Sequence, residues 1–148
     1  MPGILIGVDG SGHAQRALEW AVNEAAVRRA ALTVLTVSPV AVSTWTGTPI
    51  TSEADEPVRE QARQAVQDAV GKAAGKLTGE ARPASVTVRA VSGNPAEELV
   101  NASREADLVV VGSRGTGGFG RLALGSVSSQ VSHHAHCPVV IVPPESRE

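Results

Sequence analysis

The sequence predicts an α/β protein with an open, mostly parallel sheet and helices on both faces. Five short apolar runs alternate along the chain with segments of helical periodicity, an order typical of parallel strands joined by right-handed crossovers. Three of the runs, at 4–8, 108–111 and 139–142, are apolar almost throughout. Such continuous runs are expected of strands that are covered on both faces.

The two remaining runs complete the expected sheet. Residues 32–37 form a second strand and residues 86–91 form a third. Apolar and polar residues alternate more in the third strand, which favours a position towards an edge of the sheet.

The first two expected helices each have a candidate cap and an apolar face. The first begins at a cap on Ser11 and ends near Arg29, and the second begins at a cap on Thr51 or Ser52. Apolar residues recur every three or four positions in both, which is the spacing of one helix face. The faces expected to be buried are Ala14, Ala17, Leu18, Ala21, Val22 and Ala25 in the first helix, and Val58, Ala62, Ala65, Val66, Ala69, Ala73 and Leu77 in the second.

Two more helices have clear starts. Asn94 followed by Pro95 predicts a cap and a proline at the first helical position. The fourth helix is expected from Gly125 and Ser126 to about Ala135.

One long segment, residues 39–52, is rich in Thr, Ser and Pro and is predicted to be irregular. It follows the carboxyl end of the second strand, where open α/β sheets carry loops that cover ligands.

Composition excludes several classes of protein. The length suits one domain over residues 1–148, with an ordered core of about 1–143 and a tail over 144–148. A net charge of −2 offers no basic surface to nucleic acid, and an aromatic content of 2% argues against base-stacking platforms. A single cysteine indicates a reducing compartment. No run is long enough for a signal peptide or a membrane span, so we expect a cytoplasmic protein with no membrane or nucleic-acid partner.

The segment after the fourth expected strand carries the strongest indication of function. Six glycines lie between 112 and 125, and this loop leads to Gly125 and Ser126 at the start of a helix. Glycines let the backbone approach a ligand, and the free N–H groups of a helix start attract anions. Ser128 and Ser129 add hydroxyl donors. The segment is interpreted as a phosphate cradle; the alternative is a surface loop whose glycines only permit turns.

Two other glycine motifs do not apply. Residues 115–120 match G-x-G-x-x-G, but the helix begins too late and the next strand ends in prolines, without the acidic residue of a dinucleotide site. The chain has no G-x-x-x-x-G-K-[ST] motif, so it is not a P-loop nucleotide hydrolase.

Four residues reproduce the nucleotide signature G-2x-G-9x-G-[S/T]: Gly112, Gly115, Gly125 and Ser126. In this spacing the chain resembles the ATP-binding branch of the universal stress protein family. The resemblance covers nearly the whole chain, including the first strand ending in Asp9, the turn over 91–95 and the closing segment over 136–142.

The resemblance implies a fold and a ligand. The fold is a five-stranded parallel sheet of order 3-2-1-4-5, as one family domain that usually forms a homodimer. The ligand is ATP, with Mg²⁺ or Mn²⁺ held mainly through the phosphates, and the implied role is regulation in stress physiology.

The resemblance also assigns ligand roles to residues at strand ends. Asp9 would accept a hydrogen bond from a ribose hydroxyl; alternatively it forms a turn or caps the first helix. Gly7, Val8 and Val37 would line the adenine, or they are ordinary strand core. The full set expected to bind nucleotide is Gly7, Val8, Asp9, Val37, Val111, Gly112, Arg114, Gly115, Gly125, Ser126, Val127 and Ser128.

Two other groups of polar residues have weaker interpretations. Arg114 would screen phosphate charge, or it is an ordinary surface arginine. His133, His134 and His136 next to Cys137 look like a metal site. However, His133 and His134 diverge by about 100° on a helix, so we expect no metal there and treat the cysteine as a small buried hydrophobe.

No catalytic constellation is present in the sequence. It has no Ser-His-Asp order, G-x-S-x-G elbow or paired-carboxylate motif, and no evident base to activate water. The leading interpretation is therefore an ATP-binding regulator without catalytic residues. The alternatives are a slow ATPase and an interaction module that binds no nucleotide.

The last apolar run is predicted to form the interface of a homodimer. Family order places it at an edge of the sheet, and a bare apolar edge aggregates unless it is paired, covered or blunted. Two copies would pair this strand about a two-fold axis; the alternative is a monomer whose edge is blunted by the prolines that follow. The downstream protein partner is not indicated. The residues of the expected seam are Val139, Val140, Ile141 and Val142.

Overall fold

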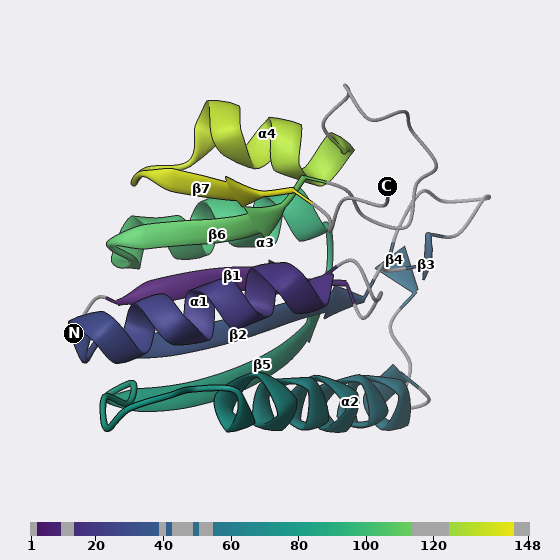
Figure 1. Ribbon diagram of the computed structural model, residues 1–148. Helices are drawn as coiled ribbons and strands as arrows, with labels where there is room; N and C mark the ends of the chain where they lie inside the picture. The colour runs from purple at the N-terminus through teal and green to yellow at the C-terminus, as the bar shows by residue number, and fades with distance from the viewer. Residues whose placement is uncertain are drawn as a thin grey trace, which may run out of the picture.

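Most of the described residues fold around a five-stranded parallel sheet (Figure 1). The computed structural model describes residues 3–9, 14–38, 41–42, 49–50, 55–113 and 125–143. The strands, in order across the sheet, are β5 (Ser85–Ser92), β2 (Ala31–Ser38), β1 (Ile4–Val8), β6 (Leu108–Gly112) and β7 (Val139–Val142). Counted along the chain, this is the order 3-2-1-4-5, and the predicted fold class is confirmed.

Helices cover both faces of this sheet. α1 (Ala14–Arg28) and α2 (Asp55–Gly75) pack on one face. α3 (Pro95–Ala102), the 3₁₀ turn η1 (Ser103–Glu105) and α4 (Ser126–His134) lie on the other. The predicted helices are confirmed within a few residues, while the proposed caps Ser11, Thr51 and Ser52 lie outside the described residues.

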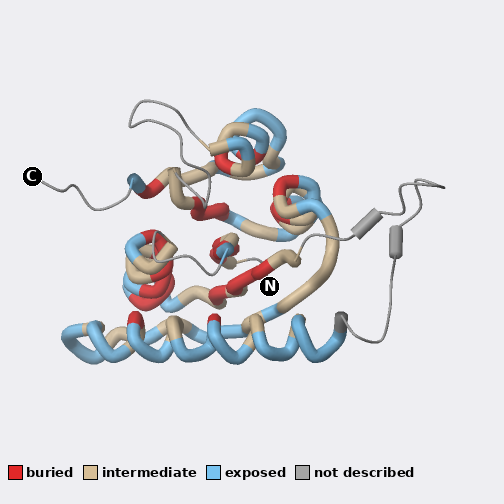
Figure 2. The backbone as a smooth tube through the Cα atoms, turned by 90° about the vertical axis from the view of Figure 1, so that its right-hand side faces the viewer, coloured by how far each residue is buried: buried red, intermediate tan, exposed pale blue. Residues whose placement is uncertain are grey.

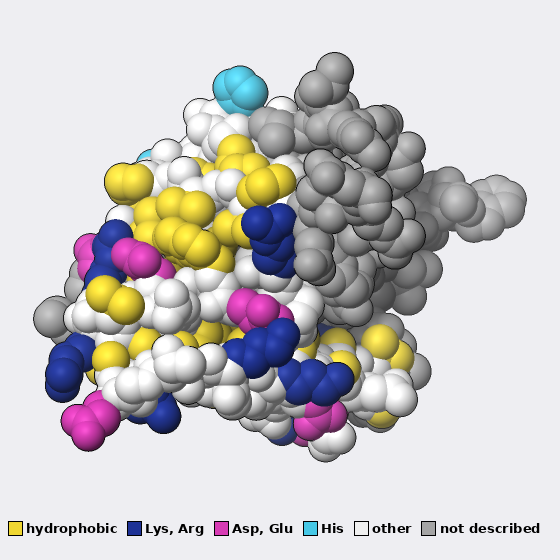
Figure 3. Space-filling view, in the orientation of Figure 1, with side chains coloured by type: hydrophobic (Ala, Val, Ile, Leu, Met, Phe, Trp, Pro, Cys, Tyr) yellow, Lys and Arg dark blue, Asp and Glu magenta, His cyan; other side chains and the backbone are white. Residues whose placement is uncertain are grey.

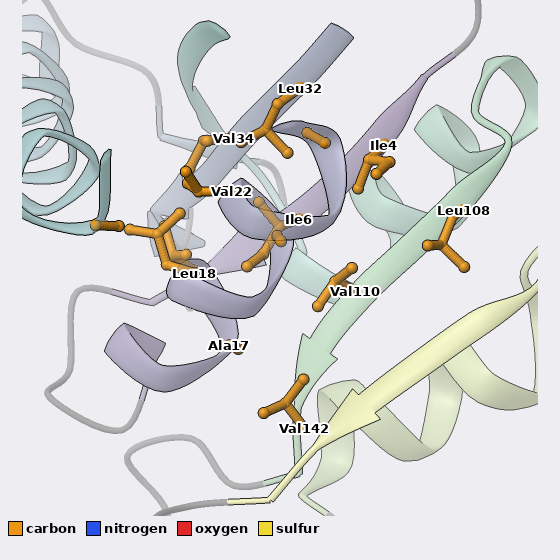
Figure 4. Close-up of a cluster of buried hydrophobic side chains, with 14 of the residues drawn as sticks. Ile4, Ile6, Ala17, Leu18, Val22, Leu32, Val34, Leu108, Val110 and Val142 are labelled. Atoms are coloured by element: carbon orange, nitrogen blue, oxygen red, sulfur yellow. The ribbon is translucent and has the colours of Figure 1, made fainter. Parts of the chain in front are cut away.

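Alternation along the strands divides the core into two clusters. Ile4 and Ile6 of β1 point towards α1, where they meet Leu18 and neighbouring apolar side chains (Figure 4). Val8 belongs to the same cluster. Leu5 points to the opposite face, towards α3 and α4. Because successive side chains of a strand face opposite sides, an apolar run buried on both faces serves two clusters at once. Figure 2 shows buried positions along the central strands and the inner sides of the helices.

α3 and α1 show how local sequence sets helix ends. Asn94 caps α3, since its Oδ1 accepts a hydrogen bond from the Glu97 N–H at 3.0 Å, and Pro95 follows it as predicted. α1 ends without a glycine. Arg29 has a φ of 54°, and the Ala30 N–H donates to the Ala25 carbonyl at 2.9 Å, which is the closing bond of a Schellman motif.

The predicted buried face of α2 is wrong at two positions. Val58 is 55% exposed, and Ala65 is also exposed. Val66 and Ala73 are the buried residues. α2 covers the edge strand β5, so only a narrow face of the helix finds a partner, and much of its surface is exposed (Figure 2).

Residues 39–52, predicted to be irregular, contain two short strands. β3 (Ala41–Val42) pairs antiparallel with β4 (Pro49–Ile50), outside the main sheet. Two-residue strands are too short to produce an alternating pattern, so the sequence carried no trace of this pairing.

The two edges of the main sheet differ. β5 was predicted to lie towards an edge, and this is confirmed. β7 forms the other edge, and only Val142 of its four residues is buried. Both faces of β7 are covered as expected, since Val140 and Val142 pack in the cluster under α1 while Val139 and Ile141 pack in the cluster under α3 and α4. The three residues other than Val142 are only half-buried because an edge strand has no neighbour on one side. In the described part of the chain, no helix has the length and hydrophobicity required to cross a membrane.

Candidate functional site

The carboxyl ends of β1 and β6 form the candidate site. The chain proceeds from β1 through β2 to β5 in one direction, then returns to place β6 and β7 on the other side of β1. The strand order therefore reverses between β1 and β6, and ligands of open α/β sheets bind at such a reversal. Asp9 directly follows β1 and is exposed, and Gly112 ends β6.

The apolar residues of the expected site also belong to the core. Val8 is 8% exposed and packs in the cluster under α1, while Val111 is 3% exposed and packs in the cluster under α3 and α4. Val37 is half-buried at the end of β2. A side chain on Gly7 would meet α3, since its Cβ would lie 2.5 Å from Leu99 Cδ1. Gly7 thus has a packing reason to be glycine.

Main-chain bonds join the two ends of the glycine loop. The Gly125 N–H donates to the Ser113 carbonyl at 2.8 Å, and the Ser113 N–H donates to the Val142 carbonyl at 3.0 Å. The end of β6, the start of α4 and the end of β7 are therefore held together. Arg114 and Gly115, both expected to bind nucleotide, lie outside the described residues.

The start of α4 has the geometry of an anion-binding helix end. Gly125 is its N-cap, with φ −64° and ψ 161°, and no side chain of a described residue caps it. The Ser129 N–H donates to the Gly125 carbonyl at 2.9 Å, whereas the N–H groups of Ser126 and Val127 precede the first intrahelical bond. Ser126 is exposed and Val127 is half-buried.

Further polar residues at this edge were not expected from the sequence. The Gly93 N–H donates to the Ser38 carbonyl at 2.9 Å, which ties the end of β5 to the end of β2. Gly93 has a φ of 153°, in the region that favours glycine. Arg59 of α2 donates to Ser92 Oγ at 3.1 Å. An arginine among the many charges of an exposed helix matches no motif, so only the fold reveals its position.

The histidines and the cysteine lie at the other end of α4. The His133 Nδ1 is 2.7 Å from the Ser129 carbonyl, and the His136 main-chain N–H donates to Ser103 Oγ at 3.0 Å. Within the described ranges, no three His, Cys, Asp or Glu side chains come together as metal ligands. Cys137 is half-buried and packs in the cluster under α3 and α4, and burial, with a smaller effect of Asp107, raises the pKa of its thiol.

The family follows from comparison with known proteins. The model of the universal stress protein family matches residues 2–143. The chain belongs to this family. A universal stress protein of Mycolicibacterium smegmatis is 37% identical over 141 residues, which are 95% of this chain and 47% of that relative. The chain therefore spans about half the length of the curated relatives it matches.

Solved structures of universal stress proteins share the fold. UspA of Lactobacillus plantarum is 28% identical, with a TM-score of 0.74 over 95% of this chain and 97% of that one. A universal stress protein solved in complex with cAMP is 29% identical, with a TM-score of 0.65 over 96% of each chain.

Proposed function

We propose that this universal stress protein binds ATP between the carboxyl ends of β1 and β6, and that the bound nucleotide makes it a regulator in the stress response. One observation carries the proposal: the spacing Gly112, Gly115, Gly125, Ser126 ends at the start of α4, which no described side chain caps. A helix start with free N–H groups and the positive end of the helix dipole suits phosphate.

The start of α4 would hold the phosphates. The N–H groups of Ser126 and Val127 and the Ser126 hydroxyl are the donors we assign to them, together with Gly115 and Arg114 of the glycine loop. These residues are neutral or cationic, and a carboxylate ligand for a metal ion is absent from the set. A divalent ion, Mg²⁺ or Mn²⁺, would therefore be held through the phosphates, where it neutralises their charge.

The strand ends would hold the nucleoside. Asp9 is exposed at the end of β1, beside the reversal of strand order, and we assign its carboxylate to a ribose hydroxyl. Val37 supplies an apolar wall for the adenine at the end of β2. The side chains of Val8 and Val111 are buried in the core, and a Cβ on Gly7 would meet Leu99. We therefore assign these three residues main-chain contact with the base.

The solved relative in complex with cAMP supports an adenine nucleotide as the ligand class. The choice of ATP within that class rests on the glycine spacing from Gly112 to Ser126, which resembles the signature of the ATP-binding branch of the family.

We also propose that the protein is a homodimer that pairs through β7. The β5 edge carries Arg89 and several polar residues, which blunt it against pairing. The β7 edge, Val139–Val142, has no charge. Beside it a groove of about 540 Å³ lies between α1 and β7, lined by apolar residues such as Trp20 and Val140 and by charged residues such as Glu19 and Lys76. Figure 3 shows hydrophobic side chains gathered on this face of the molecule. The apolar edge therefore suits a second copy.

The experiment begins with purified protein, which is heated so that any bound nucleotide is released and can be analysed. Unchanged ATP is the expected product. ADP that accumulates with turnover would favour the slow ATPase, and the absence of nucleotide would favour an interaction module.

Titration with ATP, AMP and cAMP then ranks the ligands, and Gly125→Val is the test variant. The φ of −64° at Gly125 is open to any residue, so the variant should fold. Its Cβ would stand where backbone and phosphate meet, and we expect ATP binding to weaken by about 1–3 kcal/mol. Unchanged affinity in the folded variant would contradict the site.

A further inference from the structure

The serines at the start of α4 share one chemistry but not one environment. Ser126 is exposed and Ser129 is half-buried, whereas Ser128 is 2% exposed. The sequence pattern treats all three hydroxyls as equivalent donors to a phosphate. Burial separates Ser128 from the others.

The Ser128 hydroxyl is already engaged within the protein. Its Oγ lies 3.0 Å from the Gly125 carbonyl oxygen and 3.3 Å from the Ser113 carbonyl oxygen. A serine hydroxyl has a single proton to donate, so these two carbonyls share it. The group has no second proton with which to donate to a ligand.

The two acceptors belong to opposite ends of the glycine loop. Ser113 follows β6 and Gly125 precedes α4, and one main-chain bond, from the Gly125 N–H to the Ser113 carbonyl, joins them directly. Ser128 adds a side-chain donor to the same pair of residues from inside α4. Ser113 is itself anchored to the end of β7 through the Val142 carbonyl.

We infer that Ser128 is a positioning residue: its hydroxyl holds the end of β6 against the start of α4 and does not contact the ligand. This assignment replaces the ligand role that the sequence pattern suggested for it. It deepens the proposed function, on which its affinity test rests, because the spacing of Ser113 and Gly125 sets where the donors of the α4 start stand. Its structural part concerns the protein alone.

The structural part is tested by amide hydrogen exchange in the nucleotide-free protein. In Ser128→Ala, the Gly125 amide should exchange about five-fold faster, as expected from the loss of one buried hydrogen bond. The Val110 amide in the central strand should not change. Ser128→Cys keeps the volume but donates weakly, so it should behave as Ser128→Ala does.

Ser132→Ala is the matched control. The Ser132 hydroxyl donates to the Ser129 carbonyl at 2.8 Å, the same kind of bond to a carbonyl three residues back, and this bond joins two residues of α4. Its removal should leave Gly125 exchange unchanged. The inference is wrong if Ser128→Ala leaves Gly125 exchange unchanged, or if Ser128→Cys matches the wild type, since volume would then be what matters.

The affinity part compares ATP with adenosine. Ser128→Ala should raise the Kd for ATP about five-fold and leave the Kd for adenosine unchanged, because only the phosphates meet the α4 start. A loss of ATP affinity without faster Gly125 exchange would mean that Ser128 contacts the ligand directly, and would overturn the inference. If the wild type binds neither compound, the proposed function fails, and the exchange experiment still decides the role of Ser128.

Discussion

Asp9 directly follows β1 and is exposed at the point where the strand order reverses, so its proposed ribose contact can be tested alone. Asp9→Ala should weaken ATP and adenosine equally, by about 1.5–3 kcal/mol, because both ligands carry the ribose and a charged acceptor is lost. Calorimetric titration well below the melting temperature measures both affinities.

The matched variant is Asp9→Glu, which keeps the charge but moves the carboxylate by one methylene. This variant should also bind ATP and adenosine less tightly than the wild type. If Asp9 only caps α1, the melting temperature falls while both affinities stay the same.

Cys137 gives a pH-dependent prediction. Burial raises the pKa of its thiol, so the folded protein favours the protonated form. The resulting contribution to stability is present below the pKa of the unfolded chain and is lost as pH rises through the higher folded pKa.

Alkylation by iodoacetamide, followed by mass spectrometry, should therefore reach half its maximal rate at a higher pH in the native protein than in the urea-unfolded chain. The thiolate is the nucleophile, so the midpoint reports the pKa and not only access. Coincident midpoints would contradict the prediction.

At the scale of elements, Gly7 controls how closely α3 approaches β1. Gly7→Ala would place a Cβ 2.5 Å from Leu99 Cδ1, and we expect a loss of about 1–3 kcal/mol in the free energy of unfolding. Urea denaturation measures this change. The double variant Gly7→Ala/Leu99→Ala should lose less than the sum of its two single variants, since each substitution relieves the other.

Gly71→Ala in α2 is the control for glycine replacement. Nothing lies within 4 Å of a Cβ at Gly71, so the substitution should add about 0.5–1 kcal/mol through helix propensity. If both variants shift stability in the same direction, close packing of α3 on β1 is not the reason for glycine at position 7.

At the scale of the whole molecule, the two sheet edges predict the assembly. Val140→Lys would put a charge in the proposed seam, where pairing must remove it from water, so the dimer should dissociate into monomers. Light scattering at micromolar concentration measures the mass, and the wild type should show twice the 15.1 kDa of one chain.

Val86→Lys on the opposite edge is its control. Val86 is 43% exposed on β5, so a lysine there should leave the dimer intact. A wild-type mass of one chain, or equal dissociation in the two variants, would refute pairing through β7.

The sequence by itself determined the order of the main-sheet strands and of the helices between them, the face of α1 and the start of α3. Each depends on local information: a period of two or 3.6 residues, or a cap such as Asn94 beside its proline. The glycine spacing from Gly112 to Ser126 is likewise local. The family resemblance that it carries implied the sheet order and the nucleotide-binding site. The end of α1 has no glycine to mark it in the sequence, because Arg29 adopts the left-handed conformation that glycine usually takes at such a position.

Only the tertiary structure decided which residues meet across the chain. Val58 and Ala65 fit a helical stripe, but the sheet beneath α2 is too narrow to cover them. Gly7 is a glycine because of Leu99, and the Ser128 hydroxyl turns towards Ser113, a residue 15 positions away. Periodicity reports which side of an element is apolar, whereas the partner of a side chain depends on contacts between segments that the fold alone brings together.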